Sequence, residues 1–381
     1  MAFSETSFRD TWAEINLEHI YENVARVKKN FRQEMNVMAV VKADGYGHGA
    51  VRVAKTALRA GASYLGVALL EEAMELRKAG IDTPILVLGR TRPSDADIAA
   101  FHNITLTVFQ EEWLKIASRY LSKPLAVHLK FDTGMGRIGL REEQEAESIL
   151  DYLAGSGLYK TEGIFTHFAT ADELDDSYFT KQYERFLKVL DLVEKKGVKP
   201  KYIHCGNSAT GLRFPSKAFN MFRFGISMYG LSPSEEIKEV LPYPLKEAFS
   251  LHSTLVQVKK VPKGESISYG ATYTTQNEEW IGTVPIGYAD GWYRYHSTQG
   301  GYVLVEGEEA PITGRVCMDQ MMVRLPYKME VGTKVTLIGK QGGKRIMVDD
   351  IAERLGTINY EVPCMISKRV PRVYREQEAE S

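Results

Sequence analysis

The chain has 381 residues, which is too long for one ordinary domain and fits a barrel-sized domain plus a smaller one. Hydrophobic residues make up 44% of it and charged residues 25%, values typical of a soluble globular protein, so wholesale disorder is excluded. The 48 basic and 49 acidic residues leave a formal net charge of -1, which provides no global field to attract nucleic acid or an anionic membrane. We therefore expect a protein that binds small molecules.

Cysteine usage and the N-terminus indicate a cytoplasmic protein. Cys205, Cys317 and Cys364 are far apart, with no CxxC pair and no fourth partner for a zinc site or a disulfide framework. The first residues lack the apolar core of a signal peptide, and no stretch approaches the ~18 apolar residues of a membrane span. We expect a reducing compartment, no bound metal and no membrane contact.

The first two thirds of the chain alternate short apolar runs with longer amphipathic ones, as repeated βα units do. The eight runs predicted to be strands are 37–41, 64–68, 85–89, 104–108, 125–130, 163–167, 202–205 and 221–224. Helices are predicted between them, for example over 71–79 and 179–196, each followed by a glycine suited to a left-handed cap. Eight repeats favour a (β/α)8 barrel, although a doubly wound open sheet has the same local pattern.

After Pro242 and Pro244 the pattern changes to β-branched residues in alternation, which predicts a mainly β domain. Its predicted strands are 253–258, 280–284, 302–305 and 334–338. The proline pair predicts the boundary, so we assign 12–241 to the barrel and 242–381 to the β domain, joined by residues 1–11. The alternation of Trp12–Asn16 also permits a strand that pairs with the β domain.

Polar residues stand at the ends of four predicted barrel strands: Lys42, Lys130, His167 and Arg223. Barrel enzymes gather their chemistry at the carboxyl ends of the strands, so these side chains would converge on one mouth. A lysine there is placed to act as a nucleophile toward a carbonyl group. Read alone, each of these residues could equally be a solvated charge or a structural side chain.

Five segments, in order along the chain, give a more specific indication. They are AVVKADGYGHG (39–49), HLKFDTGMGRIG (128–139), FRFGISMYG (222–230), SYGATY (268–273) and RVCMDQ (315–320). Together they resemble the bacterial alanine racemase family over essentially the whole chain. The resemblance implies a fold-type III pyridoxal 5'-phosphate (PLP) enzyme with an N-terminal (β/α)8 barrel, a mainly β C-terminal domain and a homodimer with two shared active sites. It therefore favours the barrel over the open sheet.

The resemblance also implies which residues bind PLP. Lys42 matches the lysine that joins the cofactor covalently, and Arg223 matches the arginine that faces its pyridine nitrogen. Because arginine keeps its proton, it would leave that nitrogen unprotonated and confine the reaction to proton exchange. His167 matches a histidine linked to the arginine. The expected phosphate contacts are Tyr46, Ser208, Gly225, Ile226 and Tyr360, and Asn207 is a further expected cofactor-binding residue. Ser208 could instead serve as a helix N-cap.

The remaining implied residues bind and process the substrate, alanine. Racemisation needs acid–base groups on both faces of a planar intermediate, and the resemblance assigns these roles to Lys42 and to Tyr269 of the partner subunit. Arg137 would contact the substrate carboxylate, with Lys130 beside it as a possible carbamate. Met318 would contribute a backbone N–H from the partner. Tyr288, with Tyr360, would narrow the entrance.

The expected activity is interconversion of L- and D-alanine, supplying D-alanine for peptidoglycan precursors. The nearest alternative is a related racemase acting on serine or a larger amino acid, since a pocket separates one methylene by only about 1–3 kcal/mol. A fold-type III decarboxylase would place an acidic residue where Arg223 stands. A non-catalytic PLP-binding protein would resemble the barrel alone, whereas here the match continues through Tyr269 and Met318.

Overall fold

The structure, a computed structural model, describes residues 8–31 and 35–376 and divides the chain into two compact units. The barrel unit comprises residues 19–246, and the β unit combines residues up to Glu18 with residues from Glu247 onward. The domain change therefore comes five residues after the boundary predicted at 241/242. Asn23 explains the difference, because its side chain donates to Lys246 O (2.9 Å) and accepts from Lys246 N (3.0 Å), which holds the segment after the prolines on the barrel unit.

Eight parallel strands form the barrel, and all eight predicted strands are present. The first strand pairs with the last, which excludes a doubly wound open sheet and confirms the predicted (β/α)8 architecture. The barrel strands are β2 Asn36–Val40, β3 Tyr64–Val67, β4 Ile85–Val87, β5 Ile104–Val108, β6 Leu125–Lys130, β7 Tyr159–Phe165, β8 Tyr202–His204 and β9 Met221–Phe224. The order of paired strands runs from β8 through β2 to β9. Between β8 and β9, the two ends of this order, Arg223 N donates to Gly206 O (3.1 Å).

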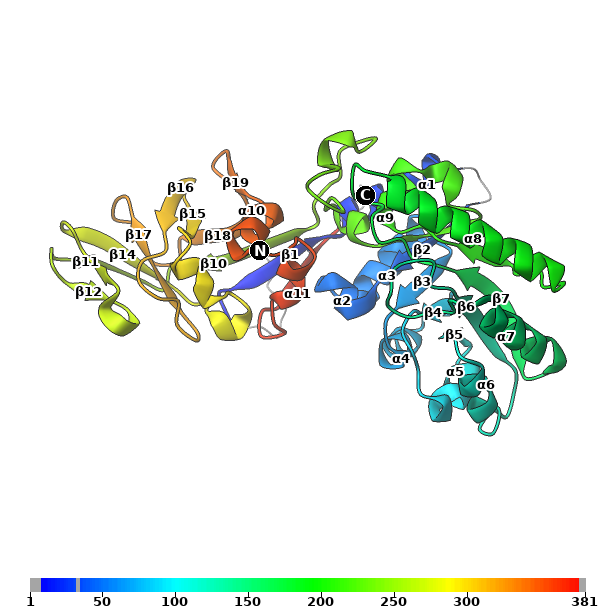
Figure 1. Ribbon diagram of the computed structural model, residues 1–381. Coiled ribbons are helices and arrows are strands. Elements are labelled where there is room, and N and C mark those ends of the chain that lie inside the picture. The colour runs from blue at the N-terminus through cyan, green and yellow to red at the C-terminus, as the bar shows by residue number, and fades with distance from the viewer. Residues whose placement is uncertain (1–7, 32–34, 377–381) are drawn as a thin grey trace, which may run out of the picture. The chain divides into compact units, whose positions relative to one another are not determined.

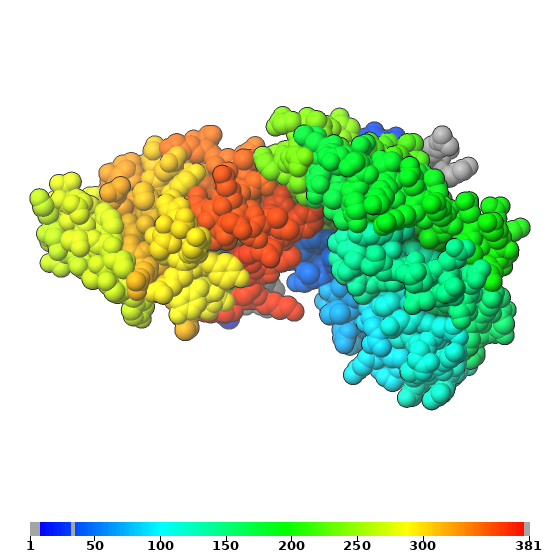
Figure 2. Space-filling view, in the orientation of Figure 1, coloured from blue at the N-terminus to red at the C-terminus, as the bar shows by residue number. Residues whose placement is uncertain are grey.

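Helices surround these strands (Figure 1). Both helices named from the sequence are present, shifted by one or two residues at their ends. The longest helix, α8, forms part of the outer surface of the barrel unit together with α7 (Figure 2). The helices that begin in this unit or at its edge are α1 Leu17–Lys29, α2 Lys42–Tyr46, α3 Ala50–Arg59, α4 Leu70–Lys78, α5 Ala96–Phe101, α6 Glu111–Ala117, α7 Glu143–Gly155, α8 Ser177–Lys195 and α9 Ser208–Arg213, with short 3-10 turns at Pro93–Asp95, Pro215–Lys217, Ile226–Tyr229 and Lys238–Val240.

The β unit is built on a seven-stranded sheet in the order β16-β15-β18-β10-β1-β20, with β19 paired to β18. Smaller sheets are formed by β11-β14-β17 and by β12-β13. The elements are β1 Trp12–Asn16, β10 Phe249–Thr254, β11 Gln257–Val261, β12 Ser266–Ile267, β13 Tyr273–Thr274, β14 Glu279–Val284, β15 Tyr302–Val305, β16 Glu308–Pro311, β17 Met321–Leu325, β18 Lys334–Gln341, β19 Lys344–Ile346, β20 Arg372–Arg375, α10 Val348–Leu355 and α11 Glu361–Met365, with 3-10 turns at Tyr269–Ala271, Tyr288–Asp290 and Arg294–Ser297.

Two expectations for the β unit are corrected. The assignment of residue 12 onward to the barrel is wrong for β1, which pairs antiparallel with β10 and parallel with β20. Trp12, Ala13 and Ile15 are buried, and because side chains alternate along a strand, Ala13 and Ile15 lie on one face of the sheet and Trp12 on the other. The predicted strand 253–258 is two strands in different sheets, because Leu255 and Val256 turn the chain between β10 and β11. Of residues 1–11, which we assigned to the β domain, residues 8–11 belong to the β unit and residues 1–7 lie outside the described part of the chain.

Within the described residues, no helix is both long and apolar enough to cross a membrane. In that same part of the chain, no group of three or more His, Cys, Asp or Glu side chains is arranged to hold a metal ion.

Candidate active site

Lys42 follows the end of β2 and opens a left-handed turn. Ala43, Asp44 and Tyr46 have φ values of 52°, 53° and 52°, a region that side-chain-bearing residues avoid at a cost of roughly 1–2 kcal/mol each. Only Gly45, at 61°, occupies it without that cost. The turn brings the Tyr46 ring centroid to 5.9 Å from Lys42 Nζ. Such concentrated strain requires support from the surrounding structure.

Glu72, in the first turn of α4, supplies part of that support. Its Oε1 accepts from Ala43 N (2.6 Å), and its Oε2 accepts from Ala68 N (2.7 Å) and Leu69 N (3.1 Å). One carboxylate thus joins the turn after Lys42 to the loop between β3 and α4. Asp44 adds a second anchor, because its Oδ1 accepts from Ala50 N (2.9 Å).

Hydroxyl and backbone N–H groups converge near Tyr46. Ser208 Oγ accepts from Gly225 N (3.0 Å) and lies 3.4 Å from Ser227 N. A Cβ on Gly225 would lie 2.9 Å from the Tyr46 hydroxyl and 3.9 Å from Ser208 Oγ, so a side chain here would fill the space between them. Ile226, the next residue, begins the 3-10 turn that follows β9. These groups form a cradle of neutral donors.

Asn207 has a structural role in holding this cradle. Its Oδ1 accepts from Thr210 N (3.0 Å) and from the Thr210 hydroxyl (3.1 Å), which makes it the N-cap of α9. The alternative interpretation of Ser208 as the N-cap is therefore wrong. Ser208 is the first helical residue, and its hydroxyl faces Gly225 instead.

Arg223 is 4% exposed and is held by two histidines and three carbonyl groups. Nη1 donates to His204 Nδ1 (2.7 Å), and Nη2 contacts His167 Nδ1 (3.0 Å). The carbonyl acceptors are those of Thr166, Cys205 and, at 3.4 Å, His204. Among the described residues, no acceptor meets Nε. Burial lowers the pKa of Arg223 to about 10, so the guanidinium stays charged at neutral pH and has one N–H to offer a ligand.

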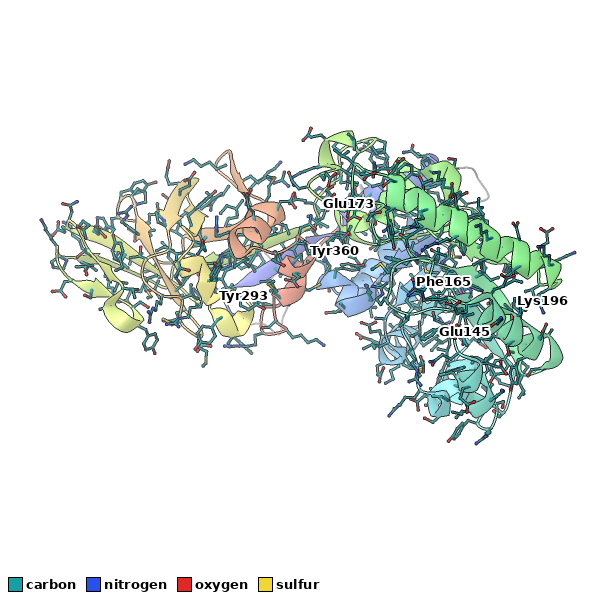
Figure 3. The ribbon with its side chains drawn as sticks, viewed as in Figure 1. Glu145, Phe165, Glu173, Lys196, Tyr293 and Tyr360 are labelled. Atoms are coloured by element: carbon teal, nitrogen blue, oxygen red, sulfur yellow. The ribbon has the colours of Figure 1, made fainter. Side chains whose placement is uncertain are left out.

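Lys130, at the end of β6, is 5% exposed and lies among other cations. Burial lowers the pKa of Lys130 to about 7, and the positive charges of Arg137, Arg223 and Lys42 contribute to this shift. The negative charge of Asp132 opposes it. Lys130 Nζ lies 5.4 Å from the centroid of Phe165, which Figure 3 shows among the barrel strands. Burial and the same cations hold the pKa of His167 well below its usual range, so His167 is neutral.

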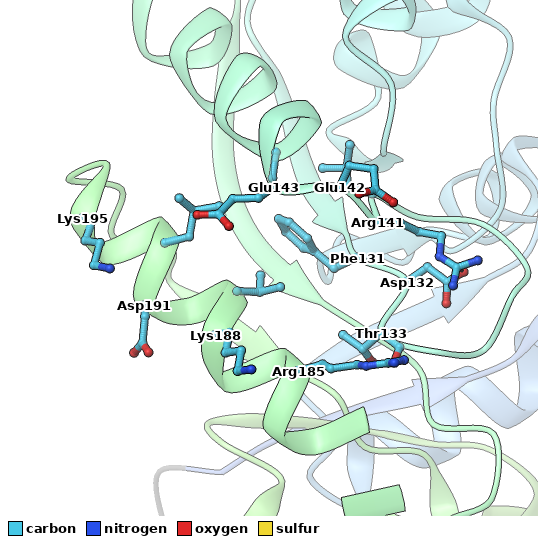
Figure 4. A pocket seen from close by; sticks show the side chains of 14 residues that line it. Phe131, Asp132, Thr133, Arg141, Glu142, Glu143, Arg185, Lys188, Asp191 and Lys195 are labelled. Atoms are coloured by element: carbon cyan, nitrogen blue, oxygen red, sulfur yellow. The ribbon is translucent and has the colours of Figure 1, made fainter. Parts of the chain in front are cut away.

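Arg137 is exposed on the loop that follows β6. Asp132 shapes this loop, because its Oδ1 accepts from Gly134 N (3.0 Å) and Gly136 N (3.0 Å). The Arg137 charge lowers the pKa of both Lys130 and His167, so Arg137 lies within electrostatic reach of them. All the residues predicted in the barrel half thus gather around one mouth. Separately, a cavity of about 500 Å³ lies behind the loop, between α7 and α8, and none of the predicted residues lines it (Figure 4).

The predicted residues of the β unit lie on adjoining loops. Tyr288 N donates to Cys317 O (3.0 Å) and Ala289 N donates to Met318 O (3.0 Å). Ser268, just before Tyr269, donates its hydroxyl to Arg315 O (2.6 Å). The side chains of Tyr269, Tyr288 and Met318 are 70%, 40% and 53% exposed. Tyr360 precedes α11 in the same unit (Figure 3).

An ionic network around the buried Asp290 side chain fixes these loops. Asp290 accepts two hydrogen bonds from Arg9 (2.6 and 3.0 Å) and one from Gly287 N (3.0 Å). Arg369 lies 3.5 Å from Asp290 and also donates to Asp319 (2.6 Å). The loops that present Tyr288 and Met318 are therefore joined through charged side chains.

Several residues that hold the site had no predicted role: Glu72, His204, Asp290 and His128, whose Nδ1 lies 2.9 Å from His204 Nε2. Glu72 was visible only as one of two acids opening a predicted helix, and the histidines only as members of apolar strands. The position of His204 one residue before the end of the predicted strand 202–205 was the one signal that could have singled it out.

The fold and site define a (β/α)8-barrel protein with its polar side chains collected at the carboxyl ends of the strands, continued by a β unit that presents exposed tyrosines. The models of the N-terminal and C-terminal domains of alanine racemase match residues 15–233 and 248–374. The chain belongs to the alanine racemase family.

Individual relatives agree with this assignment. The chain is 58% identical to the alanine racemase of Halalkalibacterium halodurans over 373 residues, covering 97% of this chain and 96% of that protein. The crystal structure of alanine racemase from Bacillus anthracis with bound L-Ala-P matches with a TM-score of 0.95 at 51% identity, covering 97% and 96% of the two chains. A histidine racemase from Leuconostoc mesenteroides matches with a TM-score of 0.91 at 32% identity, covering 97% and 99%.

Proposed function

We propose that this protein is a PLP-dependent alanine racemase that interconverts L-alanine and D-alanine and thereby supplies D-alanine for peptidoglycan precursors. The observation that carries the activity is the extent of the match: both family models, in order, and relatives above 50% identity over nearly the whole chain. The local arrangement of Lys42, Arg223 and Ser208 supports the cofactor.

The residues around the barrel mouth fit PLP. The cradle of Ser208, Tyr46 and the backbone of Gly225 and Ile226 offers neutral donors in a space that a side chain would fill, as a phosphate group requires. Tyr360 would add a hydroxyl. Arg223 Nε offers an N–H to the pyridine nitrogen, and Lys42 offers an amine to the aldehyde. When bound, PLP withdraws electrons from the Cα of an attached amino acid and so acidifies its Cα–H bond.

Arg223 would restrict the chemistry to proton exchange. The guanidinium is buried against neutral His167 and His204, and with a pKa of about 10 it donates hydrogen bonds without giving up a proton to the acceptor. A pyridine nitrogen facing it receives a hydrogen bond without becoming protonated. That arrangement disfavours reprotonation away from Cα, the step that leads to transamination.

Arg137 would hold the substrate carboxylate, and Lys130 would position Arg137. With a pKa of about 7, part of Lys130 is uncharged at neutral pH, and an uncharged amine can attack the carbon of CO2 and release a proton to form a carbamate. The resulting anion would be stabilised by Arg137, Arg223 and Lys42, the cations that disfavour the ammonium form. As a carbamate, Lys130 would orient Arg137 toward the substrate.

Two acid–base groups would complete the reaction. Lys42 Nζ would remove or return the Cα proton on one face, and the hydroxyl of Tyr269 of the partner subunit would serve the other. The exposure of Tyr269, Tyr288 and Met318 supports a homodimer, because exposed apolar and aromatic side chains on adjoining loops are typical of interaction surfaces. In the dimer, Met318 N–H would reach the substrate carboxylate, and Tyr288 would narrow the entrance.

A second candidate is racemisation of a larger amino acid. The match to a histidine racemase at 32% identity favours keeping this possibility, because it shows the same fold in a protein named for another side chain. Identity to alanine racemases is higher, at 51–58% for the relatives given above.

The test is loss of optical rotation from L-alanine, serine and histidine, with and without added PLP. We expect alanine to give the highest kcat/KM and the rate to depend on PLP. A protein that shows the visible absorbance of bound PLP but leaves every amino acid unchanged would be a cofactor-binding module, and the proposal would be wrong.

A further inference from the structure

A chain of hydrogen bonds extends from Arg223 into the barrel interior. Arg223 Nη1 contacts His204 Nδ1 at 2.7 Å, and His204 Nε2 contacts His128 Nδ1 at 2.9 Å. The three residues come from β9, β8 and β6, and both histidines are fully buried. The chain therefore links the charged residue at the mouth to a side chain inside the barrel.

Only one arrangement of protons satisfies this chain. A guanidinium can donate but never accept, so His204 Nδ1 must accept and carries no hydrogen. A neutral His204 then has its hydrogen on Nε2 and donates to His128 Nδ1, which leaves the His128 hydrogen on Nε2 as well. Burial, reinforced by the Arg223 charge, lowers the pKa of His128 to about 3 and that of His204 well below its usual range, so both are neutral.

The last hydrogen of this hydrogen-bond chain, on His128 Nε2, meets no acceptor in the described part of the protein. His128 Nε2 is buried and has no hydrogen-bond partner there. The rings of Tyr64, Phe165 and Tyr202 surround the His128 imidazole, with their centroids 5.9, 6.5 and 5.9 Å from its centroid. Gly163 makes room for it, since a Cβ there would lie 2.5 Å from the imidazole. A buried donor without a partner costs stability, and a phenyl ring at this position would avoid that cost.

We propose that His204 and His128 are positioning residues for Arg223, which fix its guanidinium so that Nε–H is the donor left for the cofactor nitrogen. This inference rests on the proposed function for its purpose, although the hydrogen-bond chain itself does not. His204 holds Arg223 directly, and His128 holds the ring of His204. Without an acceptor at position 128, His204 Nε2–H would be unpaired. Rotation of the ring to relieve this would move Nδ1 away from Nη1.

Two variants separate positioning from packing. His128→Phe fills the space and removes the acceptor, whereas His128→Asn offers Oδ1 near the place of Nδ1. His252→Phe is the matched control, because His252 is also buried and neutral but lies in the β unit, bonded to Thr336 and Ser250. Thermal melting establishes that each variant is folded.

The first readout is independent of catalysis. In ¹⁵N NMR spectra of the apoenzyme labelled at histidine, we expect His128 and His204 to be neutral with hydrogen on Nε2 from pH 6 to 8, and the His204 signals to shift in His128→Phe. A charged His204, or hydrogen on its Nδ1, would overturn the proposal.

The second readout is the ratio of transamination to racemisation in the PLP-loaded enzyme. We expect His128→Phe to raise this ratio about tenfold, the effect of losing one hydrogen bond of ordinary strength, while His128→Asn and His252→Phe stay within about twofold. A folded His128→Phe protein with an unchanged ratio would also overturn the proposal. If the wild type shows the expected NMR spectra but racemises nothing, the proposed function fails and the hydrogen-bond chain stands.

Discussion

The two units present their candidate residues in opposite ways. In the barrel unit, Arg223 and Lys130 are almost fully buried; Arg223 is held by hydrogen bonds, and Lys130 lies against the Phe165 ring among other cations. In the β unit, Tyr269 and Met318 are more than half exposed, although the Asp290 network fixes the Met318 loop and the Ser268 hydrogen bond to Arg315 O fixes the Tyr269 loop. The difference indicates that the barrel unit contains a preorganised site, whereas the β unit presents exposed side chains suited to contact another subunit. A shared site in a homodimer accounts for both.

The largest effect should come from the barrel half. Lys42→Ala removes both the amine that would bind PLP and one proton-transfer group, so we expect racemisation to fall by at least about 10⁴-fold. Borohydride reduction followed by peptide mapping should label the peptide containing residue 42 in the wild type alone. Labelling of another lysine in the variant would show that the cofactor is joined elsewhere.

Replacing Arg223 tests whether this buried residue determines which reaction occurs, racemisation or transamination. Arg223→Glu would let the pyridine nitrogen hold a proton, so we expect racemisation to drop by about 10²-fold or more and transamination to rise relative to it. Pyruvate formation and loss of optical rotation measure the two reactions. Equal decreases in both would remove our account of Arg223.

A substitution at Glu72 tests whether a residue distant from the reacting atoms holds the turn after Lys42 in place for the cofactor. Glu72→Gln replaces one accepting oxygen with an amide that cannot accept from the backbone, at a cost of about 1–3 kcal/mol. We expect PLP to bind about tenfold more weakly at least, because the strained turn after Lys42 loses an anchor. Glu71→Gln, at the exposed neighbouring position, is the control. Cofactor titration followed by absorbance makes the comparison, and similar affinities for the two variants would contradict this role.

Carbamate formation on Lys130 should have the smallest effect on activity, and this effect should depend on pH. Its depressed pKa of about 7 means that the amine is protonated below that pH and cannot add CO2. With ¹³C-labelled bicarbonate, the carbamate signal in NMR spectra should be present above pH 7 and decline as the pH falls through it. Addition of bicarbonate to CO2-depleted enzyme should raise kcat/KM a few-fold at most. A signal that also appears in Lys130→Ala would assign the carbamate to another amine.

The sequence pattern was sufficient for the eight barrel strands, because strands buried on both faces are continuous apolar runs and each is followed by an amphipathic helix. The choice of a closed barrel over an open sheet came from the family resemblance. The sequence was less informative where tertiary context decides. Asn23 moves the domain boundary past Lys246, and the positive φ angles of Ala43, Asp44 and Tyr46 contradict their local preferences. The same limit applies to His128 and His204, since a histidine in an apolar strand has the same sequence pattern whether it packs or holds an arginine. Roles taken from the family resemblance remain predictions for each residue.

Mixing two inactive variants tests the shared site most directly. Lys42→Ala and Tyr269→Phe homodimers each lack one group in both sites, whereas a mixed dimer has one site with both groups intact. After the two proteins are unfolded and refolded together in equal amounts, half of the dimers should be mixed, so we expect about one quarter of wild-type activity. Activity that stays at the level of the separate variants, in samples shown to contain mixed dimers, would place Lys42 and Tyr269 of each site on the same chain and contradict the account.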